Sequence, residues 1–230
     1  MRRLFCLLGL FATLAAAHAR DTRTCRIVFL GAPENAPAKL HLFDGEESRE
    51  VELPRINFSP VYLLPSGELL LRMLPEEATN PKDVSPDAPS VALSKAVTDF
   101  YLLVSSDPAN KIAPVKLEIL DATKLAKGEM LWCNLTPNSL DGQLGSQKLE
   151  LAGNARTNLK PPTHKNEDYN VKISFHTPTN TLLQPLCETK WQYDPLSRSV
   201  FFVVQKDGER VPRVMGLTDY REPGKRAGKR

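Results

Sequence analysis

Residues 169–175 read Tyr-Asn-Val-Lys-Ile-Ser-Phe, a strict alternation of apolar and polar side chains. Successive side chains of a β-strand point to opposite faces of a sheet, so this order predicts a strand with one buried and one wet face. Shorter runs of the same kind occur along the whole chain, for example Val115–Ile119 and Glu50–Leu53. The 19 prolines disfavour long helices, and the only helical segments we expect are short ones at Leu93–Thr98 and Ala122–Lys127.

The order of these strands is repeated in the two halves of the chain. Opening strands at Arg26–Leu30 and Met130–Asn134 each run into a turn with proline and asparagine, and aromatic apolar strands follow at Phe100–Val104 and Val200–Val204. The predicted fold class is therefore all-β, with two tandem immunoglobulin-like antiparallel β-sandwiches. We place the first sandwich at residues 20–124 and the second at 125–220. One large sandwich of two sheets is the alternative.

Residues 1–19 have the three parts of a cleavable signal peptide. Arg2 and Arg3 precede an apolar run at residues 4–17, and Ala17–Ala19 supplies a small-x-small cleavage pattern. The run is shorter than the roughly 20 residues that span a bilayer, which argues against a retained anchor. We expect a periplasmic or secreted protein with no transmembrane segment after cleavage.

The net charge of +3 comes from the two ends of the chain. Residues 221–230 are strongly basic, whereas residues 20–220 carry a slight excess of acidic side chains. A nucleic-acid-binding body needs a basic face, so we expect no nucleic-acid partner. The basic tail is expected to be disordered, with a weak electrostatic anchor to anionic envelope polymers as the alternative.

No pattern of reactive residues predicts an active site. Cys25, Cys133 and Cys187 are too far apart for metal or redox spacing, and we expect buried, inert thiols. After removal of residues 1–19 the histidines are at positions 41, 164 and 176; they show no ligand spacing, and nucleophile motifs are absent. We therefore expect no catalytic residues, no metal and no cofactor. A glycosidase-like pair of carboxylates stays an open alternative, because such residues can be far apart in the sequence and meet only in the folded structure.

Two segments are candidates for binding. Trp132 lies in an apolar strand and is expected in the core. Trp191 and Tyr193 precede a turn, and their spacing places both rings on one face, where they could stack on a sugar or clamp a peptide. Burial of that face is the competing interpretation. The proline-rich stretch Pro75–Ser90 has no aromatic residue to bury and predicts an exposed excursion, or alternatively a mobile binding loop.

The opening Val28–Pro37, the Leu40–Gly45 strand and the Ser59–Glu68 turn resemble parts of uncharacterised exported bacterial β-sandwich proteins, with Trp132–Leu135 and Trp191 as further landmarks. This resemblance implies a sandwich fold and export, and it brings no activity. We expect an exported, non-catalytic binding or structural module of the cell envelope, whose partner is an envelope protein or polymer. A glycan- or peptidoglycan-acting hydrolase and an inhibitor-like secreted module are the alternatives.

Overall fold

The structure is a computed structural model that describes residues 22–206 and 208–220. The signal peptide assigned to residues 1–19 and the basic tail at 221–230 lie outside the described residues. The described part consists of β-strands and a single 3-10 turn, η1 (Pro81–Asp83). The short helices expected at Leu93–Thr98 and Ala122–Lys127 are wrong, because both segments are turns between strands. No helix within the described ranges is long and apolar enough to cross a membrane.

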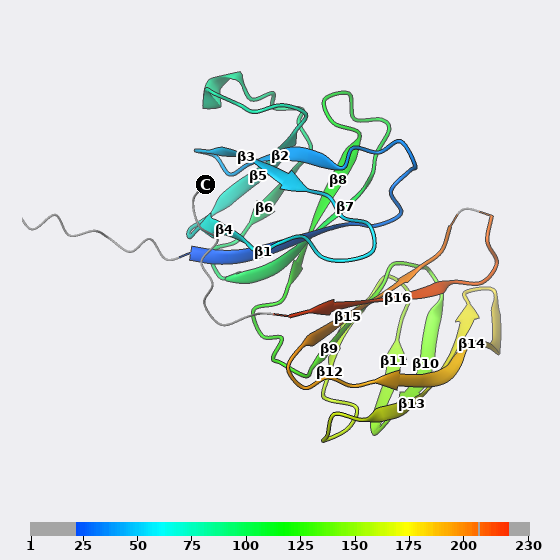
Figure 1. Ribbon diagram of the computed structural model, residues 1–230. Coiled ribbons are helices and arrows are strands. Elements are labelled where there is room, and N and C mark those ends of the chain that lie inside the picture. The colour runs from blue at the N-terminus through cyan, green and yellow to red at the C-terminus, as the bar shows by residue number, and fades with distance from the viewer. Residues whose placement is uncertain (1–21, 207, 221–230) are drawn as a thin grey trace, which may run out of the picture.

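The first half of the chain forms two four-stranded sheets (Figure 1). One sheet has the order β4-β1-β7-β8, from strands β1 (Thr22–Phe29), β4 (Tyr62–Pro65), β7 (Asp99–Ser106) and β8 (Val115–Asp121). The other has the order β3-β2-β5-β6, from β2 (Lys39–Phe43), β3 (Ser48–Glu52), β5 (Leu69–Leu74) and β6 (Ser90–Leu93).

The second half repeats this topology. One sheet has the order β12-β9-β15-β16, from β9 (Met130–Asn134), β12 (Arg156–Leu159), β15 (Arg198–Val204) and β16 (Arg213–Asp219). The other has the order β11-β10-β13-β14, from β10 (Ser139–Leu144), β11 (Gln147–Leu151), β13 (Asp168–Thr177) and β14 (Asn180–Gln192). Adding eight to each strand number converts the first half into the second. The predicted fold of two tandem β-sandwiches is confirmed.

One pair of strands in each sandwich departs from the antiparallel pattern. β1 runs parallel to β7, and β9 runs parallel to β15. Strands at the centre of a sheet that is covered on both faces carry continuous apolar runs. The aromatic stretches in β7 and β15 are runs of this kind, with five and four consecutive buried residues.

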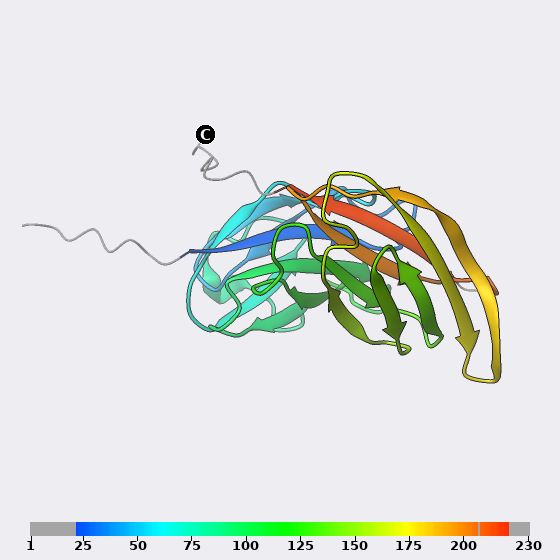
Figure 2. The same cartoon turned by 90° about the horizontal axis from the view of Figure 1, so that it is seen from below.

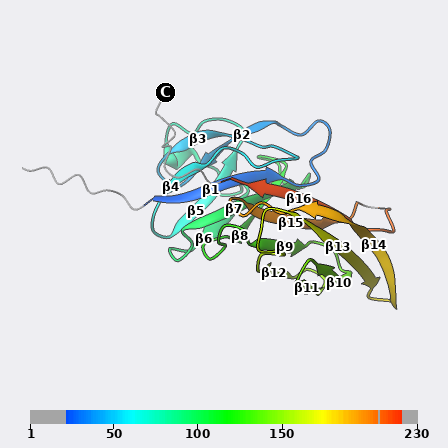
Figure 3. The same ribbon diagram turned by 60° about the horizontal axis from the view of Figure 1, so that its bottom comes forward.

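The two sheets that contain these parallel pairs pack against each other, so the four sheets form successive layers. Their contact is a continuous apolar cluster that includes Val28, Tyr101 and Leu103 from the first half and Leu131 and Phe202 from the second. In Figure 3, β16 lies beside β1 along this contact. The expectation of one wet face is therefore wrong for the inner-sheet strands β7, β9 and β15, whereas β8 keeps its alternation of buried and exposed residues.

The proline-rich stretch is anchored near its C-terminal end by a small apolar cluster and by hydrogen bonds that Ser85, Asp87 and Pro89 accept from Arg72, Asn110 and Met73. Ala88 is buried with Phe43 and Leu74, and Ala78 and Val84 pack against this small satellite cluster. The segment is an excursion between β5 and β6, as expected, but it has a core contact of its own. Small alanine and valine side chains are sufficient for this contact.

Candidate functional site

Of the two candidate stacking residues, Trp191 lies near the end of β14 and Tyr193 directly follows this strand, and both face the core of the second sandwich. Tyr193 is 7% exposed and belongs to that core. A Cβ atom added at Gly128 would come within 2.3 Å of the Tyr193 hydroxyl, so the ring is closely enclosed. Trp191 is half-buried and packs at the margin of the same core. Trp191 also lines a pocket.

Three aromatic rings hold Trp191 in place. Phe201 stacks on Trp191 with ring centroids 4.9 Å apart and an interplanar angle of 11°. Phe201 also stacks on Trp132, at 4.5 Å and 21°. Tyr169 meets the indole of Trp191 edge-on at 6.4 Å. Stacked and edge-on contacts of this kind are the favoured aromatic arrangements, so the indole is oriented before any ligand arrives. Trp132 is fully buried, as predicted.

A pocket of about 320 Å³ opens beside this aromatic group. It lies at the side of the second sandwich, between the edge strands β14 and β16 of the two facing sheets. Its lining includes Trp191, Phe201, Gly216, Ser199 and Thr218, and none of its nine lining residues is charged. We call this feature the Trp191 pocket.

The wall of the pocket on β15 and β16 is built from two neighbouring cross-strand pairs. Ser199 lies opposite Thr218, and Phe201 lies opposite Gly216. Side chains two residues apart on a strand share a face, so the two hydroxyls lie next to the aromatic ring. Neither hydroxyl has a hydrogen-bond partner among the described residues, and each can both donate and accept a bond.

Gly216 is required by the ring that crosses it. A Cβ atom at this position would lie 2.8 Å from Cε1 of Phe201, closer than packed carbon atoms approach. Any side chain here would displace the phenyl ring from its stack on Trp191. Neither Gly216 nor Phe201 stood out in the sequence, because their pairing joins two separate strands.

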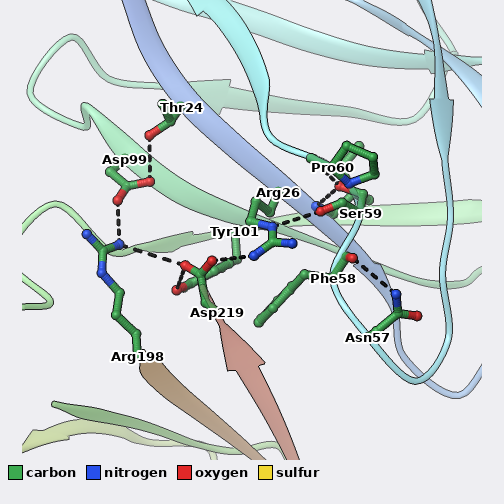
Figure 4. Close-up of polar contacts among 11 residues, drawn as sticks. Thr24, Arg26, Asn57, Phe58, Ser59, Pro60, Asp99, Tyr101, Arg198 and Asp219 are labelled. Carbon is green, nitrogen blue, oxygen red and sulfur yellow. Dashed lines mark hydrogen bonds and ion pairs between the residues drawn. The ribbon is translucent and has the colours of Figure 1, made fainter. Parts of the chain in front are cut away.

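A second group of polar residues lies between the two sandwiches (Figure 4). Asp219 forms an ion pair with Arg26 and accepts a hydrogen bond of 2.6 Å from the Tyr101 hydroxyl. Arg198 donates to Asp99 at 2.5 Å. These charges balance, and each carboxylate has an arginine partner. The group has the composition of a structural ion-pair network that joins the halves, and it leaves no free carboxylate for acid–base chemistry.

The histidines of the described ranges are divided between the two sandwiches, and the acidic residues that line pockets lie in separate pockets. No group of three or more metal-ligating side chains comes together among residues 22–206 and 208–220. His41 lies in the first sandwich, and His164 and His176 lie in the second. Four pockets of the described chain contain at most one acidic residue each, Asp168 in one and Glu209 in another.

The three cysteines of the described chain are unbonded to one another. Cys25 and Cys133 are fully buried, whereas Cys187 on β14 is partly exposed. Burial raises the pKa of the Cys133 thiol to about 12, because a thiolate is poorly solvated in an apolar core. The expectation of buried thiols holds fully for Cys25 and Cys133 and in part for Cys187.

Comparison with known proteins adds little to this geometry. No protein-family model matches the chain, and no curated protein matches it. Among solved structures, a DUF3823 family protein from Bacteroides ovatus is similar over 74% of this chain and 97% of its own. The identity is 9% and the TM-score 0.22, so this likeness supports no argument about the site. Its description names no ligand or reaction.

Proposed function

We propose that this protein is an exported, non-catalytic binding module of the cell envelope, and that its ligand docks at the Trp191 pocket. The observation that carries the proposal is a half-buried indole, oriented by Phe201, at an uncharged opening of about 320 Å³. Ligand sites combine an apolar lining with a few placed polar groups, and this pocket has both. The partner is an envelope protein or polymer.

The first sandwich and the ion-pair network provide a rigid support for this site in our proposal. The two inner sheets bury a common apolar cluster, and Asp219 connects β16 to β1 and β7 through Arg26 and Tyr101. Rigid elements hold a binding constellation more accurately than loops do. The hydrolase alternative needs two carboxylates in one cleft, and no observation here favours it.

Binding is tested by retention of the mature chain on an envelope fraction. We compare the wild type with Trp191→Ala and with Leu182→Ala as a matched control. Leu182 lies on the same strand, is 72% exposed, and stands near the tip of the β13–β14 hairpin that projects from the sheet (Figure 2). Nine positions of strand separate the two residues by about 30 Å.

Loss of retention in Trp191→Ala alone, with an unchanged far-UV spectrum, is the expected result. Equal retention of all three proteins would refute the assignment of the site. Export is tested separately by terminal sequencing of the natively exported protein, for which we expect Arg20 as the first residue. A chain that keeps Met1 would refute the export part of the proposal and leave the pocket unaffected.

A further inference from the structure

We propose that the Trp191 pocket takes a neutral pyranose ring, so that the ligand is an uncharged glycan segment. This inference rests on the proposed binding function and names the chemical class of its ligand. It is carried by three features of the pocket: an oriented aromatic face, a pair of hydroxyls with no partner among the described residues, and a lining without charged side chains.

The aromatic face suits the apolar side of a sugar ring. The face of an indole carries partial negative charge, and the C–H groups on one side of a pyranose carry partial positive charge. Stacking therefore covers apolar surface and adds a favourable electrostatic contact. Phe201 and Tyr169 already fix the indole of Trp191, which lowers the entropy lost on binding.

The hydroxyl pair suits the hydroxyl groups of the same sugar. Ser199 and Thr218 lie opposite each other in register and both line the pocket. Each hydroxyl both donates and accepts, as do the adjacent hydroxyls of a sugar. Gln192, also in the lining, can add an amide donor and acceptor.

The uncharged lining favours a neutral ligand over an ionic one. A buried carboxylate, phosphate or ammonium group is costly unless a charged or strongly hydrogen-bonding partner compensates it. The lining of the Trp191 pocket contains neither an acidic nor a basic side chain. A neutral ligand enters without this cost.

The internal repeat shows that the fold does not require these residues. The parallel pairs of the two halves end in matching hydrogen bonds, from Leu30 N–H to the Val104 carbonyl (2.8 Å) and from Leu135 N–H to the Val203 carbonyl (2.9 Å). These bonds set the correspondence between the halves.

With this correspondence, the row Trp132, Phe201, Gly216 of the second sandwich matches the row Ile27, Leu102, Ile119 of the first. Ser199 and Thr218 match Phe100 and Asp121. In the first sandwich β6 and β8 also contact each other, whereas the equivalent strands β14 and β16 border the pocket. The first sandwich thus folds without the aromatic row and the hydroxyl pair, and we infer one sugar site per chain.

A peptide strand fits this place less well. A peptide usually binds by adding to a free sheet edge, and here that edge belongs to β14. Along it lie Pro185, which donates no hydrogen bond, and the exposed charges of Glu188 and Lys190. The pairing of β13 with β14 is also irregular next to Ser174. Proline, charge and irregular pairing all hinder addition of another strand.

The test is titration of the mature chain with four neutral hexasaccharides: cellohexaose, maltohexaose, xylohexaose and N-acetylchitohexaose. Calorimetry gives the stoichiometry, and tryptophan fluorescence reports the site. A hexameric oligogalacturonide and an uncharged hexapeptide are the comparison probes. The variants are Trp191→Ala, Trp191→Phe and the double variant S199A/T218V, with Leu182→Ala as control.

We expect at least one neutral hexasaccharide to bind with one site per chain. Trp191→Ala should weaken it by about tenfold or more, since stacking on an aromatic side chain supports a change of that size. Trp191→Phe should lose less, S199A/T218V should weaken binding several-fold, and the control should bind as the wild type does.

Failure of all four neutral sugars to bind overturns the inference, as does preference for the acidic sugar or the peptide. If envelope retention still depends on Trp191 in that case, the proposed function stands and only the ligand class is wrong. If retention is also independent of Trp191, both proposals are wrong.

Discussion

Replacement of Asp219 by alanine tests how firmly the two sandwiches are joined. Asp219 is the last residue of β16 and is fully buried. Its carboxylate pairs with Arg26, accepts from the Tyr101 hydroxyl at 2.6 Å, and lies 3.9 Å from Nη1 of Arg198. Alanine would remove this acceptor and leave two poorly solvated guanidinium groups facing an apolar contact.

The expected loss of unfolding free energy depends on the hydrogen bonds that the two arginines keep in Asp219→Ala. Breaking a buried ion pair by removing one partner costs about 3–5 kcal/mol. Arg26 keeps its bond to the Ser59 carbonyl (2.7 Å) and Arg198 keeps its bond to Asp99 (2.5 Å). Each arginine side chain is also about 15% exposed. We therefore expect the lower end, about 3 kcal/mol, which lowers the thermal midpoint by about 6–12 °C for a chain of this size.

The assay is urea denaturation followed by both tryptophan fluorescence and far-UV circular dichroism. Asp219→Asn keeps the shape and one acceptor and should lose less stability than Asp219→Ala. Lys148→Ala is the matched control, because the Lys148–Glu150 pair is largely exposed and its loss should not shift the midpoint measurably. A loss below about 1 kcal/mol in Asp219→Ala would refute the network as a structural joint.

Three further predictions concern the core and two titratable groups. Tyr193→Ala should cost about 3–5 kcal/mol, since it empties an enclosed core position; an unchanged melting curve would contradict this. Burial raises the pKa of both Cys187 and Cys133, but Cys187 alone among the described cysteines is partly exposed. In the mature native chain, Cys187 should therefore react slowly with Ellman's reagent, while Cys25 and Cys133 should react only after denaturation. Mass spectrometry of the labelled peptides identifies the site. The hydrogen bond from Lys160 holds the pKa of Glu129 below its usual value. The stability that this group contributes is therefore present above its unfolded-state pKa and is lost as pH falls through the folded-state pKa. Glu129→Gln should flatten the acid side of the stability profile, and an unchanged profile would count against the pair.

The fold class could be predicted from the sequence because it depends on local patterns of residues. The alternation in residues 169–175 reports a strand directly, because side chains of a strand alternate between faces whatever lies around it. The repeated order of strands is likewise a property of the chain itself. Turns were harder to predict. Ala122–Lys127 has a helix-forming composition, but it connects the two sandwiches through successive turns. A short segment of this kind has too few residues to stabilise a helix alone.

The candidate site could be predicted from the sequence only in part. Trp191 could be singled out because a large aromatic residue near a turn is uncommon and its face follows from its position. Its neighbour Tyr193 shares that face, yet the closure of the sandwich around Gly128 buries it. Exposure depends on what covers a face, and a covering segment can come from anywhere in the chain.

The sequence by itself determined that this chain forms short strands and that the same order of strands occurs in both halves. Both properties depend on residues that are neighbours in the chain. Only the tertiary structure decided that the apolar strands β7 and β15 are covered on both faces. Each is covered on one face by the outer sheet of its own sandwich and on the other face by the inner sheet of the other sandwich. It also decided which residues meet at the pocket. Phe201 reaches Trp132, Trp191 and Gly216 through the register of three separate strands and the packing of two sheets. Register and packing are relations between distant segments, and the order of residues within one segment does not specify them.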